Sequence, residues 1–211
     1  MSSSALWHPL EREPDHPLAA LARTASPFGR LHVALGPHSR YGARWFRLCA
    51  DGRLLAEGLY NNGPRPSFCW IEVARTADLD DDGNAALFGL LRPLIPPGGH
   101  IMVEYDSPSR ADVAQALAAG VPPPATSLGE QLIRAGFGPR FKDWAIAEGG
   151  LEGPRKLQCY VPPDGATARA WAAEAGGALK AFLAGPSSHP TPVVAQALER
   201  ARRVLTLLQI R

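Results

Sequence analysis

The sequence is poor in the residues that mark metal and redox sites. Its 211 residues include three cysteines, Cys49, Cys69 and Cys159, which lie far apart and form no Cys-x-x-Cys pair. A zinc ribbon or a dithiol redox motif therefore finds no support. Cys69 and Cys159 alternate with apolar residues in predicted strands, so we expect small buried side chains in a reducing compartment.

The histidines do not cluster either. The six of them are scattered along the chain with no His-x-x-x-His spacing, so we predict no metal site. The chain also lacks a Gly-x-Ser-x-Gly elbow. This absence removes the commonest signature of a serine hydrolase.

An excess of one charge and long apolar runs are missing as well. The 22 Lys and Arg residues nearly balance the 20 Asp and Glu residues, and the formal net charge is +2. This balance gives no reason to expect a nucleic-acid partner. No apolar run approaches the roughly 20 residues that cross a bilayer. Residues 11–15 carry charges where a signal peptide needs an apolar core, so we expect a cytoplasmic protein with no membrane partner.

The first third of the chain has the pattern of an antiparallel meander. Short apolar segments at 31–35, 44–50, 53–60 and 67–74 are separated by turn residues. Asp51-Gly52 between the second and third segments is a strong hairpin signal. Residues 1–16 contain prolines and mixed charge and are expected to be poorly ordered, and a short helix is predicted over 18–24.

The middle of the chain alternates between helix and strand signals. The acidic run 78–82 supplies caps for a helix over 85–94, and an apolar strand at 101–103 follows the Pro-Pro-Gly-Gly break. Ser109 with Asp112 is expected to start the next helix, and Ser127 with Glu130 forms a capping box for another helix that ends at Gly136. Segments 141–147 and 156–161 predict a closing hairpin.

The composition shifts to alanine and glycine after residue 162. Helices are predicted over 167–183 and from Pro192 onward, the second with an apolar stripe. We therefore expect an α/β domain over 17–162 and a helical C-terminal extension over 163–211 packed on it.

This order of elements resembles the GNAT-type N-acyltransferase fold over residues 17–162. The segment Leu-Ile-Arg-Ala-Gly-Phe at 132–137 is similar to the end of that family's fourth helix, which precedes its last two strands. The resemblance implies a mixed sheet with an antiparallel meander, a central parallel strand and a C-terminal hairpin. It also implies an acyl-CoA donor and a glutamate base on the fourth strand.

Two features depart from the GNAT pattern. The family binds the CoA pyrophosphate with backbone N–H groups in a loop rich in glycine and arginine, at a helix N-terminus. Here the corresponding segment carries four aspartates between residues 78 and 82, which would repel a pyrophosphate. Leu132 stands where the family often has the tyrosine that protonates the leaving thiolate.

Two further resemblances concern the second half of the chain. Residues 100–157 are similar to an uncharacterised archaeal and bacterial family of unknown function through Phe-Lys-Asp-Trp, Glu-Gly-Gly-x-Glu-Gly and Arg-Lys-Leu-Gln. The Pro-Gly-Gly turn before the strand at 101–103 resembles the later part of a class I methyltransferase. The first half, however, lacks the glycine-rich turn of a nucleoside-binding unit.

Glu104 is the first candidate catalytic residue. It shares a face of its strand with Met102 and Asp106, while Tyr105 points the other way. A carboxylate in an apolar strand is costly unless it is paired or functional, so Glu104 is a candidate general base or amine-binding anion. The alternative is structural: Glu104 pairs with an arginine and Asp106 caps the following turn. Glu72 is a second candidate base by its position in the GNAT-like topology.

The hairpin segment carries many charged residues around a glycine-rich turn. Arg155 and Lys156 are expected to hold a carboxylate or phosphate, and Trp144 to form an apolar or cation–π wall. The alternative is a solvated turn. The candidate substrate-binding residues are Tyr105, Asp106, Lys142, Asp143, Trp144, Glu148, Glu152, Arg155 and Lys156.

These observations favour a small-molecule group transferase that acts on an amine or amino acid. The cofactor is expected to be acyl-CoA or S-adenosylmethionine, and the acidic segment favours the second donor. A hypothesis from another class is a non-catalytic scaffold that forms a homodimer through the C-terminal helix.

Overall fold

The computed structural model describes residues 7–65, 68–138, 140–143, 155–166, 168, 169 and 173. The chain divides into two compact units, residues 1–162 and 163–211. The sheet and helices considered below all lie in the first unit. Apart from a few residues after 163, the expected C-terminal helical extension lies outside the described residues.

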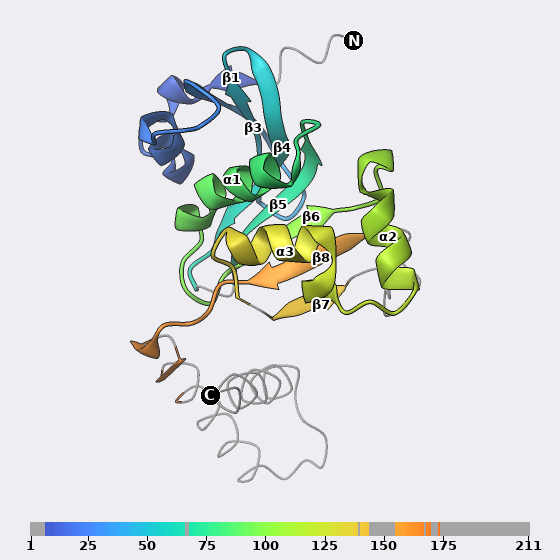
Figure 1. Ribbon diagram of the computed structural model, residues 1–211. Helices are drawn as coiled ribbons and strands as arrows, with labels where there is room; N and C mark the ends of the chain where they lie inside the picture. Colours follow the sequence, from blue (N-terminus) through green and yellow to red (C-terminus); the bar gives the residue numbers. More distant parts are fainter. Residues whose placement is uncertain are drawn as a thin grey trace. The chain divides into compact units, whose positions relative to one another are not determined.

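The first unit is built on a mixed sheet with the strand order β1-β2-β3-β4-β5-β6-β8-β7 (Figure 1). Of the described strands, β5 and β6 are the pair that runs parallel, and every other neighbouring pair is antiparallel. The expected mixed α/β sheet, with a meander, a central parallel strand and a closing hairpin, is confirmed. The strands are β1 His8–Pro9, β2 Leu31–His38, β3 Arg44–Ala50, β4 Arg53–Asn62, β5 Cys69–Thr76, β6 His100–Glu104, β7 Phe141–Asp143 and β8 Lys156–Tyr160.

The meander follows its sequence signals closely. Asp51 and Gly52 have φ values of 47° and 82°, the left-handed conformation that a two-residue hairpin turn between β3 and β4 requires. The N-terminal expectation was wrong in one respect. His8 and Pro9 form β1, which pairs with β2 at Leu35 and Ala34, so the described part of residues 7–16 is ordered against the sheet.

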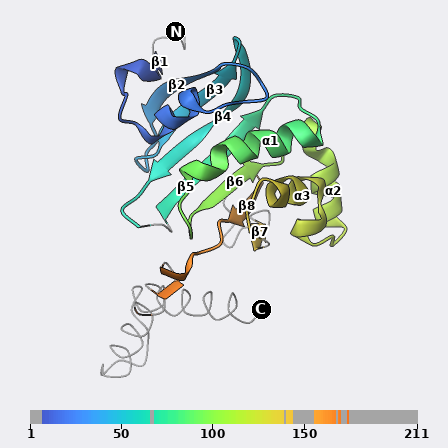
Figure 2. The same ribbon diagram turned by 60° about the vertical axis from the view of Figure 1, so that its left-hand side comes forward.

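The described α-helices are α1 Asp81–Leu91, α2 Ala111–Ala118 and α3 Ser127–Arg134. Shorter 3-10 turns are η2 Leu10–Arg12, η3 Pro17–Arg23, η5 Arg92–Leu94, η6 Pro108–Arg110 and η7 Pro123–Ala125. Helices α1 and α3 lie together across one face of the sheet (Figures 1 and 2). Alternate residues of β5 and β6, among them Ile71 and Val103, point into the core on this face.

The helix caps differ in part from the predicted ones. Asp80 caps α1 as expected, because its carboxylate accepts a 2.7 Å hydrogen bond from the Gly83 N–H. The capping box at Ser127 was placed one residue late, since Thr126 is the N-cap of α3 and accepts from the Gly129 N–H at 3.1 Å. Ser109 does not cap α2: it lies in η6, and α2 begins at Ala111 without a side-chain cap.

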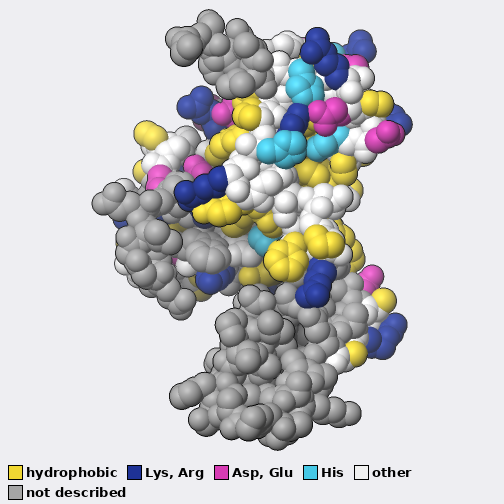
Figure 3. Space-filling model, turned by 180° about the vertical axis from the view of Figure 1, so that it is seen from behind, with side chains coloured by type: hydrophobic (Ala, Val, Ile, Leu, Met, Phe, Trp, Pro, Cys, Tyr) yellow, Lys and Arg dark blue, Asp and Glu magenta, His cyan; other side chains and the backbone are white. Residues whose placement is uncertain are grey.

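The face of the sheet opposite to α1 and α3 carries partly buried polar side chains from β5, β6 and β8. Glu72, Met102 and Gln158 are register partners across these three strands. Figure 3 views the molecule from behind, where the described surface mixes apolar, basic, acidic and histidine side chains. Of the described helices, none is long and apolar enough to cross a membrane.

Candidate functional site

The parallel strands β5 and β6 separate at their carboxyl ends. Their pairing runs from Trp70↔His100 to Val73↔Val103 and then stops. Strand β5 continues to Thr76 beside β4, while β6 continues to Glu104 beside β8. A cavity of about 210 Å³ lies at this separation. Carboxyl ends of neighbouring parallel strands are where α/β sheets commonly bind ligands.

The cavity is polar and carries both signs of charge. Its charged residues are Glu104 from β6, Arg75 from β5 and Arg110 from η6. Hydroxyl groups and short apolar side chains make up the rest of the wall: Thr76, Ser107, Ser109, Val73, Ala74 and Val103. The cavity therefore offers one carboxylate, two guanidinium groups and several hydroxyl groups to a small ligand.

Glu72, Glu104 and Lys156 form a compact ionic cluster on the face opposite to α1 and α3. Lys156 Nζ lies 2.8 Å from Glu72 Oε1 and 3.8 Å from Glu104 Oε1. The sheet register explains this meeting, because Glu104 is paired with Lys156 across β6 and β8, and Glu72 lies on the neighbouring β5. The side chains of Lys156, Glu72 and Glu104 are only 21%, 11% and 21% exposed.

Glu104 is a weaker acid than an ordinary carboxyl group. Burial is the main reason why its pKa rises from 4.5 to about 7, and the nearby carboxylates of Glu72 and Asp106 raise it further. The ammonium of Lys156 opposes this rise. A carboxyl group that is half ionised near neutral pH, and that lines a cavity, has the protonation behaviour of a general base.

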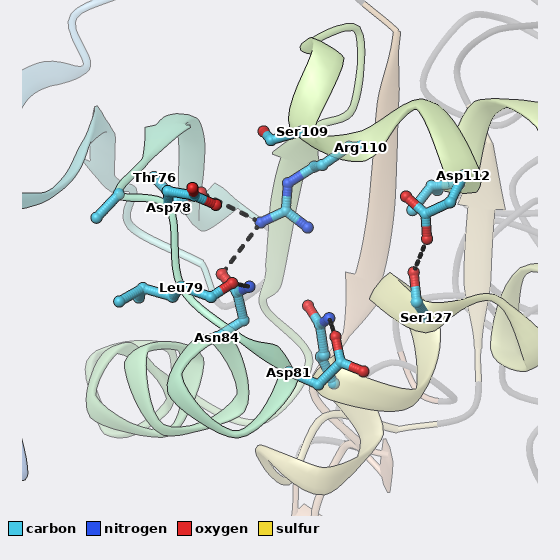
Figure 4. A pocket seen from close by; sticks show the side chains of 12 residues that line it. Thr76, Asp78, Leu79, Asp81, Asn84, Ser109, Arg110, Asp112 and Ser127 are labelled. Atoms are coloured by element: carbon cyan, nitrogen blue, oxygen red, sulfur yellow. Dashed lines mark hydrogen bonds between the residues drawn. The ribbon is translucent and has the colours of Figure 1, made fainter.

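Arg110 is a buried cation at the other side of the cavity. The residue is 6% exposed, and its Nη2 donates 3.4 Å hydrogen bonds to Thr76 Oγ1 and Asn84 Oδ1 (Figure 4). Its guanidinium also lies 5.9 Å from the centre of the Phe88 ring. Burial lowers the pKa of Arg110, and the charges of Asp112 and Asp81 oppose that change.

A second, smaller cavity of about 80 Å³ lies on the far side of Arg110, between α1, α2 and α3. It shares Thr76, Ser109 and Arg110 with the larger cavity. Two of its three aspartates accept hydrogen bonds from α3: Asp81 accepts a 2.7 Å bond from Gln131, and Asp112 accepts a 2.6 Å bond from Ser127 (Figure 4). These bonds hold both carboxylates toward α3.

Several predicted site residues lie outside the ionic cluster. Tyr105 is 1% exposed and donates a 2.6 Å hydrogen bond to Asp143 Oδ1. Asp106 accepts a 2.5 Å bond from the backbone N–H of Arg155, whose side chain lies 3.8 Å away. The turn that follows it, η6, has no side-chain cap, so the capping role considered as its alternative is not found. Neither Tyr105 nor Asp106 lines the cavity.

The remaining hairpin candidates divide between described and undescribed residues. Lys142 is an exposed residue of β7 paired with Gln158. Trp144, Glu148 and Glu152 lie outside the described residues. The two cations expected to hold an anion, Arg155 and Lys156, both pair with the protein's own carboxylates.

The sequence interpretation missed Arg110 and Arg75. Arg110 was passed over because Ser-Pro-Ser-Arg-Ala-Asp was interpreted as the start of a helix. One usable signal was its place a few residues after the central strand, where ligand-binding loops of α/β sheets lie. In the part of the chain that the structure describes, no three His, Cys, Asp or Glu side chains group as metal ligands. The three cysteines are free, and two of them are buried.

Comparison with known proteins identifies the family but no activity. Residues 68–185 match the family described as "Protein of unknown function (DUF1122)". The chain belongs to this family. No curated protein matches the sequence. One solved structure of similar fold is the crystal structure of a protein of unknown function, AQ1966, from Aquifex aeolicus VF5. The TM-score is 0.50 and the sequence identity is 23%. The match covers 85% of this chain and 93% of that chain.

The matched region contains every residue that lines the larger cavity. It begins at Phe68, just before β5, and therefore includes Glu72, Glu104, Arg110 and Lys156. The candidate site of this DUF1122 protein is thus built from the segment that defines its family, while the meander before β5 supplies the rest of the sheet.

Proposed function

We propose that this DUF1122 protein is a small-molecule transferase that moves an acyl group onto an amine. The observation that carries the proposal is the position of Glu104, a carboxyl group with a pKa of about 7 that lines the cavity between β5 and β6. Glu72 is held by Lys156 at 2.8 Å, so Glu104 is the member of the cluster that takes the proton. The antiparallel meander and separated parallel pair support a GNAT-like scaffold for this chemistry.

The proposed reaction transfers an acyl group from an acyl-CoA thioester to the nitrogen of an amine. Ionised Glu104 removes one proton from the substrate ammonium, and the free amine attacks the thioester carbonyl carbon of an acyl-CoA. A carbon–nitrogen bond forms, the carbon–sulfur bond breaks, and the thiolate leaves. The attacking nitrogen loses a second proton, which neutralises the thiolate, and Glu104 returns its proton to solvent. The base works best near neutral pH because its pKa lies there.

A second candidate is methyl transfer from S-adenosylmethionine. The observation that favours it is the acidic N-terminus of α1, where Asp80 already accepts the Gly83 N–H and Asp81 and Asp82 follow in the first turn. These carboxylates disfavour a CoA pyrophosphate at this helix end. A sulfonium cation suits a site that contains Glu72 and Glu104. The nitrogen–methyl bond forms as the sulfur–methyl bond breaks, and Glu104 takes the amine proton.

Thermal shift with the two donors separates these candidates, because a ligand that binds only the folded state raises Tm. Acyl transfer predicts a rise with millimolar acetyl-CoA, and methyl transfer predicts a rise with S-adenosylmethionine alone. Turnover of an amine should then fall at least 100-fold in Glu104→Gln with donor binding retained. Glu130→Gln on α3 is the matched control. No shift with either donor would instead favour the non-catalytic scaffold.

A further inference from the structure

We propose that the cavity between β5 and β6 binds a small amino acid, with its carboxylate on Arg110 and its ammonium facing Glu104. The amino acid would be the acceptor of the proposed transferase. Only the reaction of its ammonium group rests on the proposed function. Arg110 and Glu104 line the same cavity and come from consecutive segments of the chain, η6 and β6.

Arg110 is the anion-binding group because most of its guanidinium N–H groups donate no hydrogen bond to described residues. Its two side-chain hydrogen bonds to described residues both come from Nη2, both are 3.4 Å long, and both go to uncharged oxygens. Among the described residues, no carboxylate lies within ion-pair distance of it, and Nε and Nη1 donate to none of them. A guanidinium that is 6% exposed and lacks a direct counter-ion is suited to a bidentate bond with a ligand carboxylate.

The two aspartates whose charges raise the pKa of Arg110 do not take that place. Asp81 and Asp112 raise its pKa through their charges, but each accepts a short hydrogen bond from α3. Figure 4 shows both carboxylates directed toward those partners, with Asp112 on Ser127. They balance the charge of Arg110 at a distance and leave the larger cavity open for a ligand carboxylate.

Glu104 supplies the opposite end of the site. Lys156 Nζ is 3.8 Å from it, too far for a hydrogen bond, whereas the same ammonium makes a 2.8 Å contact with Glu72. Glu104 also shares a side-chain hydrogen bond with Glu72, and its second carboxylate oxygen can accept a hydrogen bond from another ammonium without breaking the pair between Lys156 and Glu72. Thr76, Ser107 and Ser109 provide hydroxyl groups between the two charged ends.

The size of the cavity limits the ligand to a small molecule. Its volume of about 210 Å³ exceeds the roughly 150 Å³ of an engineered cavity that holds benzene. An amino acid with a short side chain fits within this volume. A ligand that carries only one of the two charges leaves either Arg110 or Glu104 without its partner, and such unpaired groups discriminate strongly between ligands.

The test is direct binding to the full-length protein, measured by calorimetry at pH 8. The probes are each of the twenty amino acids, with acetate and butylamine as the two single-charge controls. We expect saturable binding of at least one amino acid and at least 10-fold weaker binding of both controls. Arg110→Lys keeps the positive charge but loses the planar guanidinium that binds a carboxylate through two hydrogen bonds. This change should weaken binding at least 10-fold. Arg53→Lys, at an exposed arginine of β4 that does not line the cavity, should change it less than 3-fold.

A second variant guards against misfolding of Arg110→Lys. Ser107 is exposed and lines the larger cavity, so Ser107→Tyr should block binding while the thermal unfolding of the protein stays normal. Failure of every amino acid to bind, equal binding of acetate or butylamine, or loss of binding in Arg53→Lys but not in Arg110→Lys would overturn the inference. Amino-acid binding without turnover would contradict the proposed transferase alone, and turnover of amines that lack a carboxylate would contradict the amino-acid assignment alone.

Discussion

The ammonium of Lys156 lies 2.8 Å from a carboxylate oxygen of Glu72, in a pair that is mostly shielded from solvent. The same ammonium is the cation nearest to Glu104 among the described ion pairs. It therefore controls two properties together: the charge balance of a partly buried cluster and the acidity of the proposed base.

Lys156→Met should leave Glu72 and Glu104 as two neighbouring carboxylates with no ammonium between them. Because Lys156 lowers the pKa of Glu104, its removal should shift that pKa above about 7. The folded state should lose about 2 kcal/mol at pH 8, since a partly buried ion pair has been broken. Carboxyl NMR titration and urea unfolding measure the two effects. Lys156→Arg, which keeps the charge, should show less than half of either change.

Glu104→Gln should stabilise the protein above pH 7. The folded pKa of Glu104, about 7, lies above its ordinary value of 4.5, so the folded state binds this proton more tightly than the unfolded state. The stability linked to this proton is fully present below about pH 4.5 and is lost as the pH rises through about 7. Urea unfolding at pH 5 and pH 8 should show a gain for Glu104→Gln of about 1 kcal/mol that appears only at pH 8. An equal effect at both pH values would contradict the raised pKa.

Gly58→Ala should be strongly destabilising. A Cβ atom at this position would lie 1.8 Å from the backbone oxygen of Glu72, at the irregularity between β4 and β5. The strand that carries Glu72 would have to move, at a cost of about 3 kcal/mol. Gly89→Ala in α1 is the matched control, because its Cβ meets nothing within 4 Å. There we expect a gain of about 0.5–1 kcal/mol in chemical unfolding.

Tyr105→Phe should cost about 1 kcal/mol of stability. The change removes the 2.6 Å hydrogen bond to Asp143 from a fully buried side chain and leaves the packing of the ring in place. Binding in the cavity should be unaffected, because Tyr105 does not line it. Tyr41→Phe, at a side chain with 74% exposure, should have no measurable effect. A loss of binding in Tyr105→Phe without a loss of stability would restore Tyr105 as a site residue.

Much of the fold was predictable because local signals agreed with it. Asp51-Gly52 marked its hairpin, and the strands at 44–50 and 101–103 were found close to their true bounds. The misplaced caps have a physical reason: Ser127 and Thr126 are adjacent residues with similar hydroxyl groups, and tertiary contact decides between them. Ser127 donates to Asp112 on α2, which leaves Thr126 to cap α3.

The site was predictable only where it follows the register of the strands. Alternation along β6 placed Glu104 on the same face as Met102, opposite to Tyr105, and topology suggested Glu72. Lys156 lies close to both Glu72 and Glu104 because β8 pairs with β6. No local sequence pattern specifies this pairing. Arg110 depends on burial by α1 and on the position of Thr76 and Asn84, which come from other segments of the chain.

The position of β8 also determines when this site can exist. Although it lies between β6 and β7, β8 is the last described strand to be synthesised. Glu72 and Glu104 therefore leave the ribosome well before Lys156, and a nascent chain that has paired β5 with β6 holds two carboxylates that repel each other. Insertion of β8 relieves this repulsion. The order of synthesis therefore means that the proposed base gains its neighbouring ammonium only when the sheet is almost complete.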